Sequence, residues 1–280
     1  MPRSRRFSIG WLAAVLVALA PLTVVDARAG EPAPATAGDP LTQHLPVLTG
    51  TRHIAHHSPM LGRTLHLFIR QPDLSTEEPG PAKRYPVIYL LDGDQTYPLI
   101  AAYHFYLQFA GEAPPATLVG IAYGTIDPAV NMRTTDLTAP AEGNAQYGGA
   151  DRFLAALEQE IFPLVEGDMV DRERRVLVGQ SLGGQFVLHA ALRRPGLFQL
   201  GIAVNPALHR NLAAFTEALA KPAPVSRPSW LYMSSADNDD SALPWTLKAE
   251  TLSDETHLSS LPRAYRNALR WRAGPAPAGE

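Results

Sequence analysis

One serine lies in a pentapeptide whose spacing suits nucleophilic catalysis. Residues 179–183 read Gly-Gln-Ser-Leu-Gly, a G-x-S-x-G motif, and another glycine follows at 184. The preceding residues 175–178 are typical of a buried strand and residues 186–188 of a helix, so Ser181 is predicted to occupy a sharp strand-to-helix turn. Such a turn exposes the hydroxyl and leaves the Leu182 N–H free to bind a developing oxyanion. The alternative is a glycine-rich turn that only packs tightly.

A serine hydroxyl attacks an ester only when a base removes its proton, and histidine is the usual base. In folds with this motif the histidine comes last in the chain order of serine, acid and histidine. Two histidines follow the predicted helix, His209 and His257. Because His257 lies after the last predicted strand and before the last predicted helix, we expect it to be the base. His209 is expected at the surface or the pocket rim, and His189 lies on the helix itself.

The acid of a catalytic triad is sought after the strand predicted at 230–234. Three carboxylates follow that strand, namely Asp237, Asp239 and Asp240. Asp237 is nearest the strand end, where a carboxylate could orient an imidazole, and is the predicted acid. The alternative is that all three cap a loop and that Ser181 and His257 act as a dyad. Glu255 is a minor competitor.

A second oxyanion donor is expected from the loop after the strand predicted at 85–91. This loop reads Asp-Gly-Asp-Gln at 92–95, and Gly93 permits a tight turn that would present the N–H of Asp94. An ordinary Asp-Gly turn is the alternative. No metal or other cofactor is expected: His53 and His57 would share one face of a strand while His56 points to the other, so three ligands could not converge.

The composition excludes several classes of protein. The 280 residues include 24 Lys+Arg and 27 Asp+Glu, a formal charge of −3, so the chain has no basic excess with which to bind nucleic acid. No cysteine is present, which excludes disulfides, thiolate metal sites and a cysteine nucleophile. Hydrophobic residues make up 46% and charged residues 18%, enough apolar content for a sizeable core. The expected partner is a small-molecule ester.

The first residues have the pattern of a secretory signal peptide. Three arginines precede an apolar run at 11–20, and Ala27-Arg28-Ala29 supplies the small residues that a signal peptidase requires. Pro21 interrupts the run well short of the roughly 20 apolar residues of a membrane-spanning helix. Cleavage is therefore predicted after Ala29, giving a periplasmic or secreted protein with no stable membrane insertion. Its 20 basic and 26 acidic residues would give a net charge of −6.

The remaining chain is predicted to alternate strands and helices in one domain. We expect a flexible leader at 30–47, the domain at 48–273 and a disordered tail at 274–280. Predicted strands occupy 52–57, 64–70, 85–91, 117–123, 175–178, 200–204, 230–234 and 245–252. Predicted helices occupy 96–109, 150–165 and 261–271, besides the one after Ser181. Such alternation indicates a three-layer α/β domain with a mostly parallel sheet.

One helix carries an apolar stripe at helical spacing, which predicts that its members are core residues. They are Phe153, Leu154, Leu157, Ile161 and Leu164.

Three stretches of this sequence together resemble the putative-esterase family of α/β-hydrolases. They are residues 85–93, residues 179–184 and the Asp-Glu-Thr-His run at 254–257, and residues 133–138 and 150–153 add to the likeness. The resemblance covers about 48–271, and the family includes esterase D, enterochelin esterases and mycolyltransferases.

The resemblance implies an α/β-hydrolase sandwich with Ser181 as nucleophile, His257 as base and the N–H groups of Leu182 and Asp94 as oxyanion donors. Arg133 and Asp136 would be structural. Some members near the siderophore esterases are exported and use a Ser–His pair without a well-placed acid. The expected activity is hydrolysis of carboxylic esters, siderophore or short-chain acyl, through an acyl-enzyme. The alternatives are an acyltransferase and a non-catalytic binding module.

One feature departs from the family pattern. About ten residues separate the last two predicted strands, whereas a parallel crossover needs a dozen or more and usually a helix. Either the final strand is misplaced or antiparallel, or a helix-bearing segment has been lost and the loop with Asp237 rebuilt. The second case would cast doubt on Asp237 more than on Ser181 or His257.

Overall fold

The computed structural model describes residues 48–75, 83–209, 211–221, 229–235, 246–252, 255–257 and 259–273, with the single residues 224 and 227. The predicted signal peptide, the predicted leader at 30–47 and the predicted tail at 274–280 lie outside these ranges. So do Asp237, Asp239 and Asp240.

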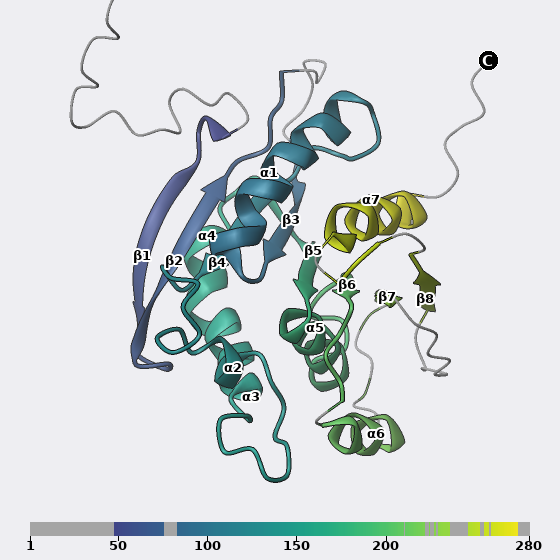
Figure 1. Cartoon of the computed structure of the whole chain (residues 1–280). Coiled ribbons are helices and arrows are strands. Elements are labelled where there is room, and N and C mark those ends of the chain that lie inside the picture. Colours follow the sequence, from purple (N-terminus) through teal and green to yellow (C-terminus); the bar gives the residue numbers. More distant parts are fainter. Residues whose placement is uncertain are drawn as a thin grey trace, which may run out of the picture. The chain divides into compact units, whose positions relative to one another are not determined.

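One sheet of eight strands forms the centre of the fold, in the order β1-β2-β4-β3-β5-β6-β7-β8 (Figure 1). The strands are β1 (Arg52–Ser58), β2 (Arg63–Arg70), β3 (Tyr85–Leu90), β4 (Thr117–Ala122), β5 (Val170–Gln180), β6 (Leu200–Val204), β7 (Trp230–Ser235) and β8 (Thr246–Thr251). β1 pairs with β2, and β2 with β4, in antiparallel fashion. All other neighbours are parallel. A mostly parallel sheet needs cover on both faces because its strands are apolar on both sides.

Helices supply that cover. They are α1 (Gly93–Phe109), α2 (Arg133–Asp136), α3 (Ala150–Ala156), α4 (Phe162–Val165), α5 (Leu182–Arg193), α6 (Leu212–Ala220) and α7 (Ser260–Ala273), and a π-helical turn at Leu157–Ile161 joins α3 to α4. In the part of the chain that is described, no helix is both long and apolar enough to cross a membrane.

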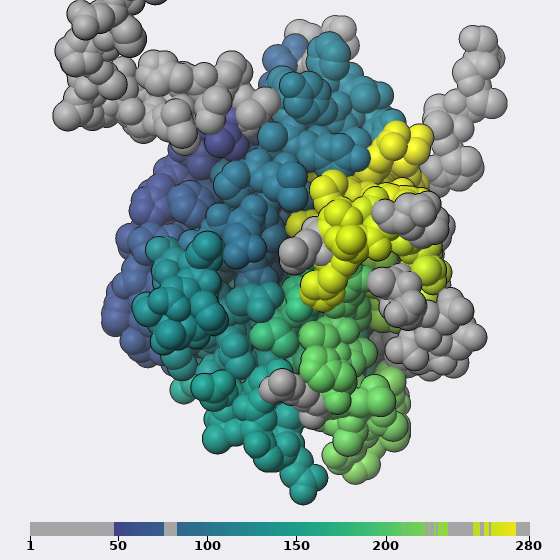
Figure 2. All heavy atoms as spheres, in the orientation of Figure 1, coloured from purple at the N-terminus to yellow at the C-terminus, as the bar shows by residue number. Residues whose placement is uncertain are grey.

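Alternate side chains of β3 show how the layers form. Val87 and Tyr89 belong to the core shared with α3, α4 and α5, whereas Ile88 and Leu90 belong to the core shared with α1 and α7. The blue α1 and the yellow α7 lie beside each other on the face seen in Figure 2. A hydrogen bond of 2.7 Å between His104 Nδ1 and the Tyr265 hydroxyl joins these two helices. The predicted three-layer α/β arrangement is confirmed.

The π-helical turn explains one wrong prediction in the core. Phe153, Leu154, Leu157 and Ile161 are buried as expected, but Leu164 is 42% exposed. A π-helical turn adds one residue to the repeat, so every later position is rotated by one. Phe162 and Val165 are buried in its place.

The final strand is neither misplaced nor antiparallel. β8 pairs with β7 in parallel register, from Trp230 opposite Thr246 to Ser235 opposite Thr251. The connection, residues 236–245, lies outside the described residues together with the aspartate cluster. The strand predicted at 245–252 is therefore present as β8, and of the two alternatives for the short connection, a misplaced or antiparallel final strand is the wrong one.

Candidate active site

Ser181 occupies the predicted turn between β5 and α5 with a strained backbone. Its φ of 59° and ψ of −116° are unusual for a residue with a side chain. The Ser181 N–H donates to the Val204 carbonyl at 2.9 Å, and the Ser181 carbonyl accepts N–H groups from Gln185 and Ala207 at 3.0 Å each. These three bonds hold the turn in place, as is required for a strained residue to persist.

Two glycines of the motif are required by the close approach of strand and helix. A Cβ on Gly179 would lie 2.3 Å from the Gly183 carbonyl oxygen, and one on Gly184 would lie 2.9 Å from the Val204 carbonyl oxygen. Gly183 is less restricted, since the nearest atom to its Cβ would be Asp92 Oδ2 at 3.2 Å. The glycine spacing thus follows from packing around the serine.

Ser181 opens into a pocket of about 290 Å³ at the carboxyl ends of the strands. His257 lines the same pocket, so the structure brings the predicted nucleophile and base to one cavity. The other lining residues are Asp92, Asp94, Gln95, Thr96, Tyr123, Thr125, Ile126, Pro128, Asn131, Arg133, Thr134 and Gln180.

The backbone of His257 is fixed through its carbonyl group. That oxygen accepts hydrogen bonds from the side-chain amide of Gln180, from Asn205 Nδ2 at 3.2 Å and from Ser260 Oγ at 3.4 Å. The side chain of His257 is exposed. Within the described residues no hydrogen bond joins its ring to Ser181. Glu255 accepts a hydrogen bond from Ser259 Oγ at 2.6 Å.

The N-termini of α1 and α5 both meet the pocket. Asp94 is the second residue of α1, and Leu182 is the first residue of α5. The first N–H groups of a helix have no intrahelical acceptor, and no other described group accepts from these two. The Asp94 carboxylate accepts the N–H groups of Tyr123 at 2.7 Å and Gly124 at 3.0 Å, which ties the start of α1 to the end of β4.

Arg133 is a pocket residue that we expected to be only structural. Its Nε donates to Asp92 Oδ1 at 2.5 Å and its Nη2 to Asp92 Oδ2 at 2.9 Å, while Nη2 also lies 3.4 Å from the Gln180 carbonyl oxygen. Burial alone would lower the pKa of Arg133, but the hydrogen bond and charge of Asp92 outweigh it and raise that pKa. The guanidinium therefore stays charged beside Ser181. Asp136, the other residue expected to be structural, is fully buried and pairs with Arg63.

No local sequence signal pairs Asp92 with Arg133, but the position of Asp92 in the structure explains the pair. Asp92 follows a buried strand and sits in a left-handed conformation with a φ of 55°. A charged residue placed at the carboxyl end of a central strand needs a partner from a neighbouring loop.

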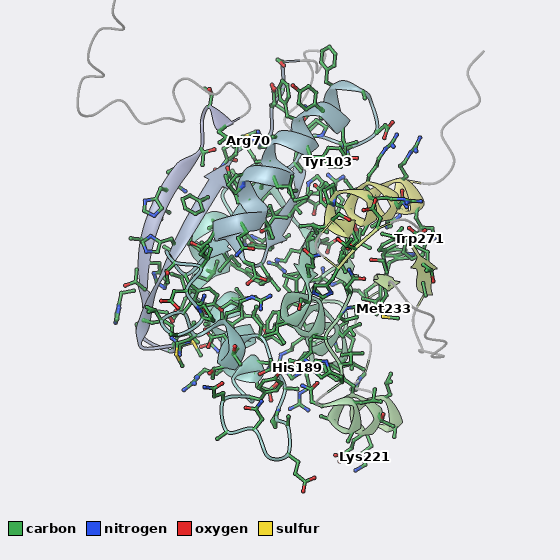
Figure 3. The ribbon with its side chains drawn as sticks, in the orientation of Figure 1. Arg70, Tyr103, His189, Lys221, Met233 and Trp271 are labelled. Atoms are coloured by element: carbon green, nitrogen blue, oxygen red, sulfur yellow. The ribbon has the colours of Figure 1, made fainter. Side chains whose placement is uncertain are left out.

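The other histidines among the described residues do not line the pocket. His189, labelled in Figure 3 on α5, bonds Asp151 at 2.9 Å, and burial lowers its pKa. His209 is exposed and does not line the pocket, in agreement with the expectation of a surface position. His56 pairs with Glu160 at 3.1 Å, and His53 bonds His66 at 2.9 Å. The described residues hold no group of three or more side chains that could bind a metal ion.

Among the described Phe, Tyr and Trp residues, Tyr123 is the one that lines the pocket. Tyr97 is buried against Gly120, and Tyr103, Phe105 and Tyr147 are also absent from the lining. Trp245 lies outside the described residues.

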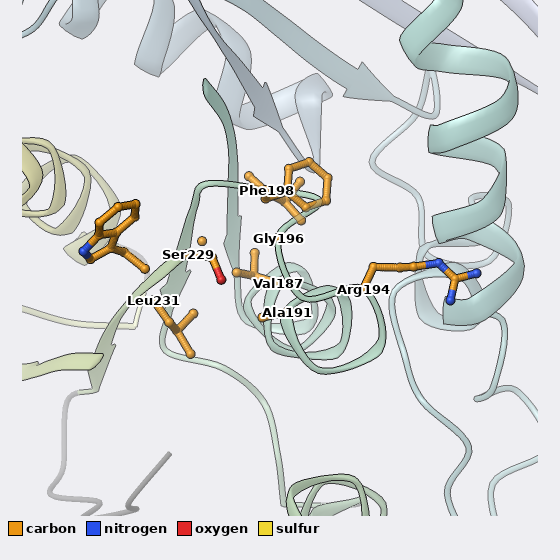
Figure 4. A pocket seen from close by; sticks show the side chains of 10 residues that line it. Val187, Ala191, Arg194, Gly196, Phe198, Ser229 and Leu231 are labelled. Carbon is orange, nitrogen blue, oxygen red and sulfur yellow. The ribbon is translucent and has the colours of Figure 1, made fainter. Parts of the chain in front are cut away.

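A second hollow, at the other end of α5, is too small for a substrate. Its volume is about 10 Å³, roughly that of one water-sized probe. Figure 4 shows Val187, Ala191 and Leu231 around it, with Arg194 extending away toward its partner Glu158 at 3.2 Å. It is a packing defect between α5, β6 and β7.

Comparison with curated proteins supports the family resemblance. The chain is 34% identical over 167 residues to the ferri-bacillibactin esterase BesA of Bacillus subtilis, a match that covers 53% of this chain and 55% of that protein. The matched region spans about half of the length of the curated relatives.

Solved structures share the fold. The BES protein from Bacillus cereus superposes with a TM-score of 0.65 at 22% identity, over 79% of this chain and 94% of that chain. An IroE-like serine hydrolase from Shewanella oneidensis superposes with a TM-score of 0.64 at 24% identity, over 79% of each chain. The sequence also matches the family described as Putative esterase over residues 58–262. Since that match takes in the turn, the pocket and the strands that carry them, this chain belongs to the putative esterase family of α/β-hydrolases.

Proposed function

We propose that this protein is an exported serine esterase that hydrolyses small-molecule carboxylic esters through an acyl-enzyme. The observation that carries the proposal is the strained Ser181 turn, which opens into one pocket with His257 and the charged Arg133. Family membership supports hydrolase chemistry, and the name of the Shewanella neighbour describes it as a serine hydrolase. Export rests on the signal-peptide pattern of residues 1–29.

In the proposed reaction Ser181 Oγ attacks the ester carbonyl carbon while His257 takes the hydroxyl proton. The carbonyl oxygen becomes an oxyanion, and the free N–H groups of Leu182 and Asp94 donate to it. When the tetrahedral intermediate collapses, His257 returns the proton to the departing alcohol. Water then attacks the acyl-enzyme with His257 again as base, which releases the acid and restores the serine.

Arg133 adds a fixed positive charge to this scheme. Its guanidinium shares the pocket with Ser181, and Asp92 holds it by two hydrogen bonds, so it needs no reorganisation as negative charge develops. We therefore assign Arg133 to stabilisation of the developing oxyanion.

The base can be held without a described carboxylate beside its ring. Gln180 and Asn205 hold the carbonyl of His257, which limits movement of its backbone. This support acts on the backbone and is the same for a Ser181–His257 dyad and for a triad. Asp237 remains the proposed acid if a triad operates.

The substrates we propose are siderophore esters or short-chain acyl esters. The names of BesA and of the Escherichia coli relative, an apo-salmochelin esterase, describe siderophore esterases. An acyltransferase of the same architecture would pass the acyl group to an added alcohol. The ratio of transfer product to free acid, measured in the presence of that alcohol, separates the two.

The test is intact-mass measurement after incubation with a fluorophosphonate probe, combined with turnover of p-nitrophenyl acetate and a siderophore ester panel. We expect one probe per chain, and Ser181→Ala should abolish labelling and lower turnover by at least about 10³-fold. Ser75→Ala, an exposed serine outside the pocket, is the matched control and should behave as the parent. A folded parent that takes up no probe would instead identify a non-catalytic binding module.

A further inference from the structure

The pocket wall contributed by the loop after β4 carries an apolar edge. Ile126 lines the pocket beside Ser181 and is nevertheless 66% exposed. Val130, also 66% exposed, and Met132 lie on the same loop. Most of the Ile126 side chain is therefore available for a ligand to cover, at the entrance to an otherwise polar and charged site.

Internal hydrogen bonds fold this loop into a defined shape. Asp127 organises it: its N–H donates to Thr125 Oγ1 at 3.1 Å, its Oδ1 accepts the Ala129 N–H at 2.9 Å, and its carbonyl accepts the Val130 and Asn131 N–H groups at 3.1 and 3.0 Å. Asn131 Nδ2 closes the loop on the Thr125 carbonyl at 3.3 Å. Ile126 is thus presented by an organised loop, which lowers the entropy cost of binding against it.

The loop is anchored at both ends to the catalytic machinery. At its start the Asp94 carboxylate binds the N–H groups of Tyr123 and Gly124. At its end Asn131 Oδ1 accepts the Arg133 N–H at 3.3 Å, directly before the guanidinium that Asp92 holds. Ile126 therefore keeps a set position relative to the oxyanion donors.

The strand order decides which part of an ester would meet Ile126. Ser181 follows β5, and the Ile126 loop follows β4, on the β3 side of β5. His257 lies on the opposite side, because Asn205 at the end of β6 binds its carbonyl. The base must protonate the departing alcohol, so the alcohol lies toward His257 and the acyl group extends away from it, toward Ile126.

We infer that Ile126 is a specificity-determining residue that binds the acyl group of the substrate and favours acyl groups with an apolar or aromatic surface. This inference rests on the proposed esterase function. The contact needs no change in mechanism, since it acts only through burial of apolar surface. It assigns substrate selection to a loop position that carries no reacting group.

The test compares Ile126→Ser with Val130→Ser on p-nitrophenyl benzoate and p-nitrophenyl acetate. Loss of an apolar contact inside a binding pocket lowers kcat/KM by about tenfold or more, and the loss is smaller where the side chain is partly exposed. Ile126→Ser should therefore lower the benzoate-to-acetate ratio of kcat/KM about fivefold to tenfold. The effect should appear chiefly in KM. Val130 has the same exposure on the same loop but does not line the pocket, so Val130→Ser should leave the ratio unchanged.

A second series assigns the contact to one side of the ester. Ethyl benzoate and p-nitrophenyl benzoate share the acyl group and differ in the alcohol, and Ile126→Ser should slow both by the same factor. The inference is overturned if the ratio of benzoate to acetate stays at the parent value, if Val130→Ser changes it equally, or if the loss follows the alcohol. Failure of the proposed function looks different, because the parent would then turn over neither ester and take up no fluorophosphonate.

Discussion

Replacing Gly179 by alanine tests whether the serine turn depends on backbone contact between β5 and α5. The new Cβ would lie 2.3 Å from the Gly183 carbonyl oxygen and 2.4 Å from its carbonyl carbon, whereas real Cβ contacts below 3.0 Å essentially never occur. Both obstructing atoms belong to the backbone of the helix's first turn. The helix start would have to move, and with it the Ser181 carbonyl that binds Gln185 and Ala207.

The cost follows from what has to move. Inserting a methyl group into a packed interior typically costs about 1–3 kcal/mol, and the upper end applies here because no flexible side chain can yield. We expect Gly179→Ala to lower the free energy of unfolding by about 3 kcal/mol. For a domain of this size that corresponds to a fall in Tm of about 6–12 °C.

Gly183→Ala is the matched control, because it adds the same methyl group within the same motif. Its Cβ would meet Asp92 Oδ2 at 3.2 Å, and Leu91 Cβ and Cδ1 at 3.6 and 3.8 Å. The free energy of unfolding should stay within about 1 kcal/mol of the parent, since alanine also favours the helix. Activity should fall about threefold to tenfold, because Asp92 must shift and Arg133 moves with it.

The assay is guanidinium unfolding of both variants, followed by tryptophan fluorescence, together with p-nitrophenyl acetate turnover. Gly179→Ala should lose stability, whereas Gly183→Ala should lose activity and keep its stability. Equal unfolding free energies for Gly179→Ala and the parent would refute the close contact from which the motif was explained.

Two further predictions concern charge. Arg133→Lys breaks the paired hydrogen bonds to Asp92. Steady-state kinetics should show kcat lower by about 10²–10³-fold, as for the loss of an oxyanion donor, and a smaller change in KM. An unchanged kcat would show that the role of Arg133 is structural only. Burial lowers the pKa of His104 from 6.5 to about 4, so the unfolded chain takes up its proton first as the pH falls. Stability from this group is present above pH 6.5 and is lost toward pH 4, by about 1.4 kcal/mol per pH unit. The free energy of unfolding, measured in urea across this pH range, should decline less steeply with falling pH in His104→Gln than in the parent. The glutamine amide can still bond Tyr265 and Pro114. Parallel pH curves for the variant and the parent would contradict the assignment.

Local sequence was sufficient for the Ser181 turn. A Cβ at Gly179 would clash with Gly183, two residues after the serine, and a Cβ at Gly184 would clash with Val204 at the end of the adjoining strand. The strand and the helix that flank the turn are contiguous with it in the sequence. The position of His257, the proposed base, was predictable for a different reason, since chain order in a parallel sheet fixes which loops meet at the carboxyl edge. Both predictions place their residues in one pocket.

The Asp92–Arg133 pair could not be predicted in the same way. The two residues are 41 positions apart, and nothing in the local pattern of either indicates the other. Leu164 illustrates a second limit, because a π-helical turn changes the periodicity on which the amphipathic pattern depends without a distinct sequence signal. Strand β5 shows a third limit. Its first five residues, 170–174, are mostly charged, so a search for apolar runs does not identify them as part of a strand.

The proposed nucleophile and base share their structural support. The residue before Ser181 is Gln180, whose side chain binds the His257 carbonyl, and Asn205 follows the strand whose last residue, Val204, accepts the Ser181 N–H. Ser181 and His257 are therefore held together at the ends of β5 and β6. These contacts reach only the carbonyl group of His257, so they fix its backbone and not the rotation of its imidazole. In the proposed mechanism a carboxylate would therefore have a separate task, which is to orient the ring and select its tautomer.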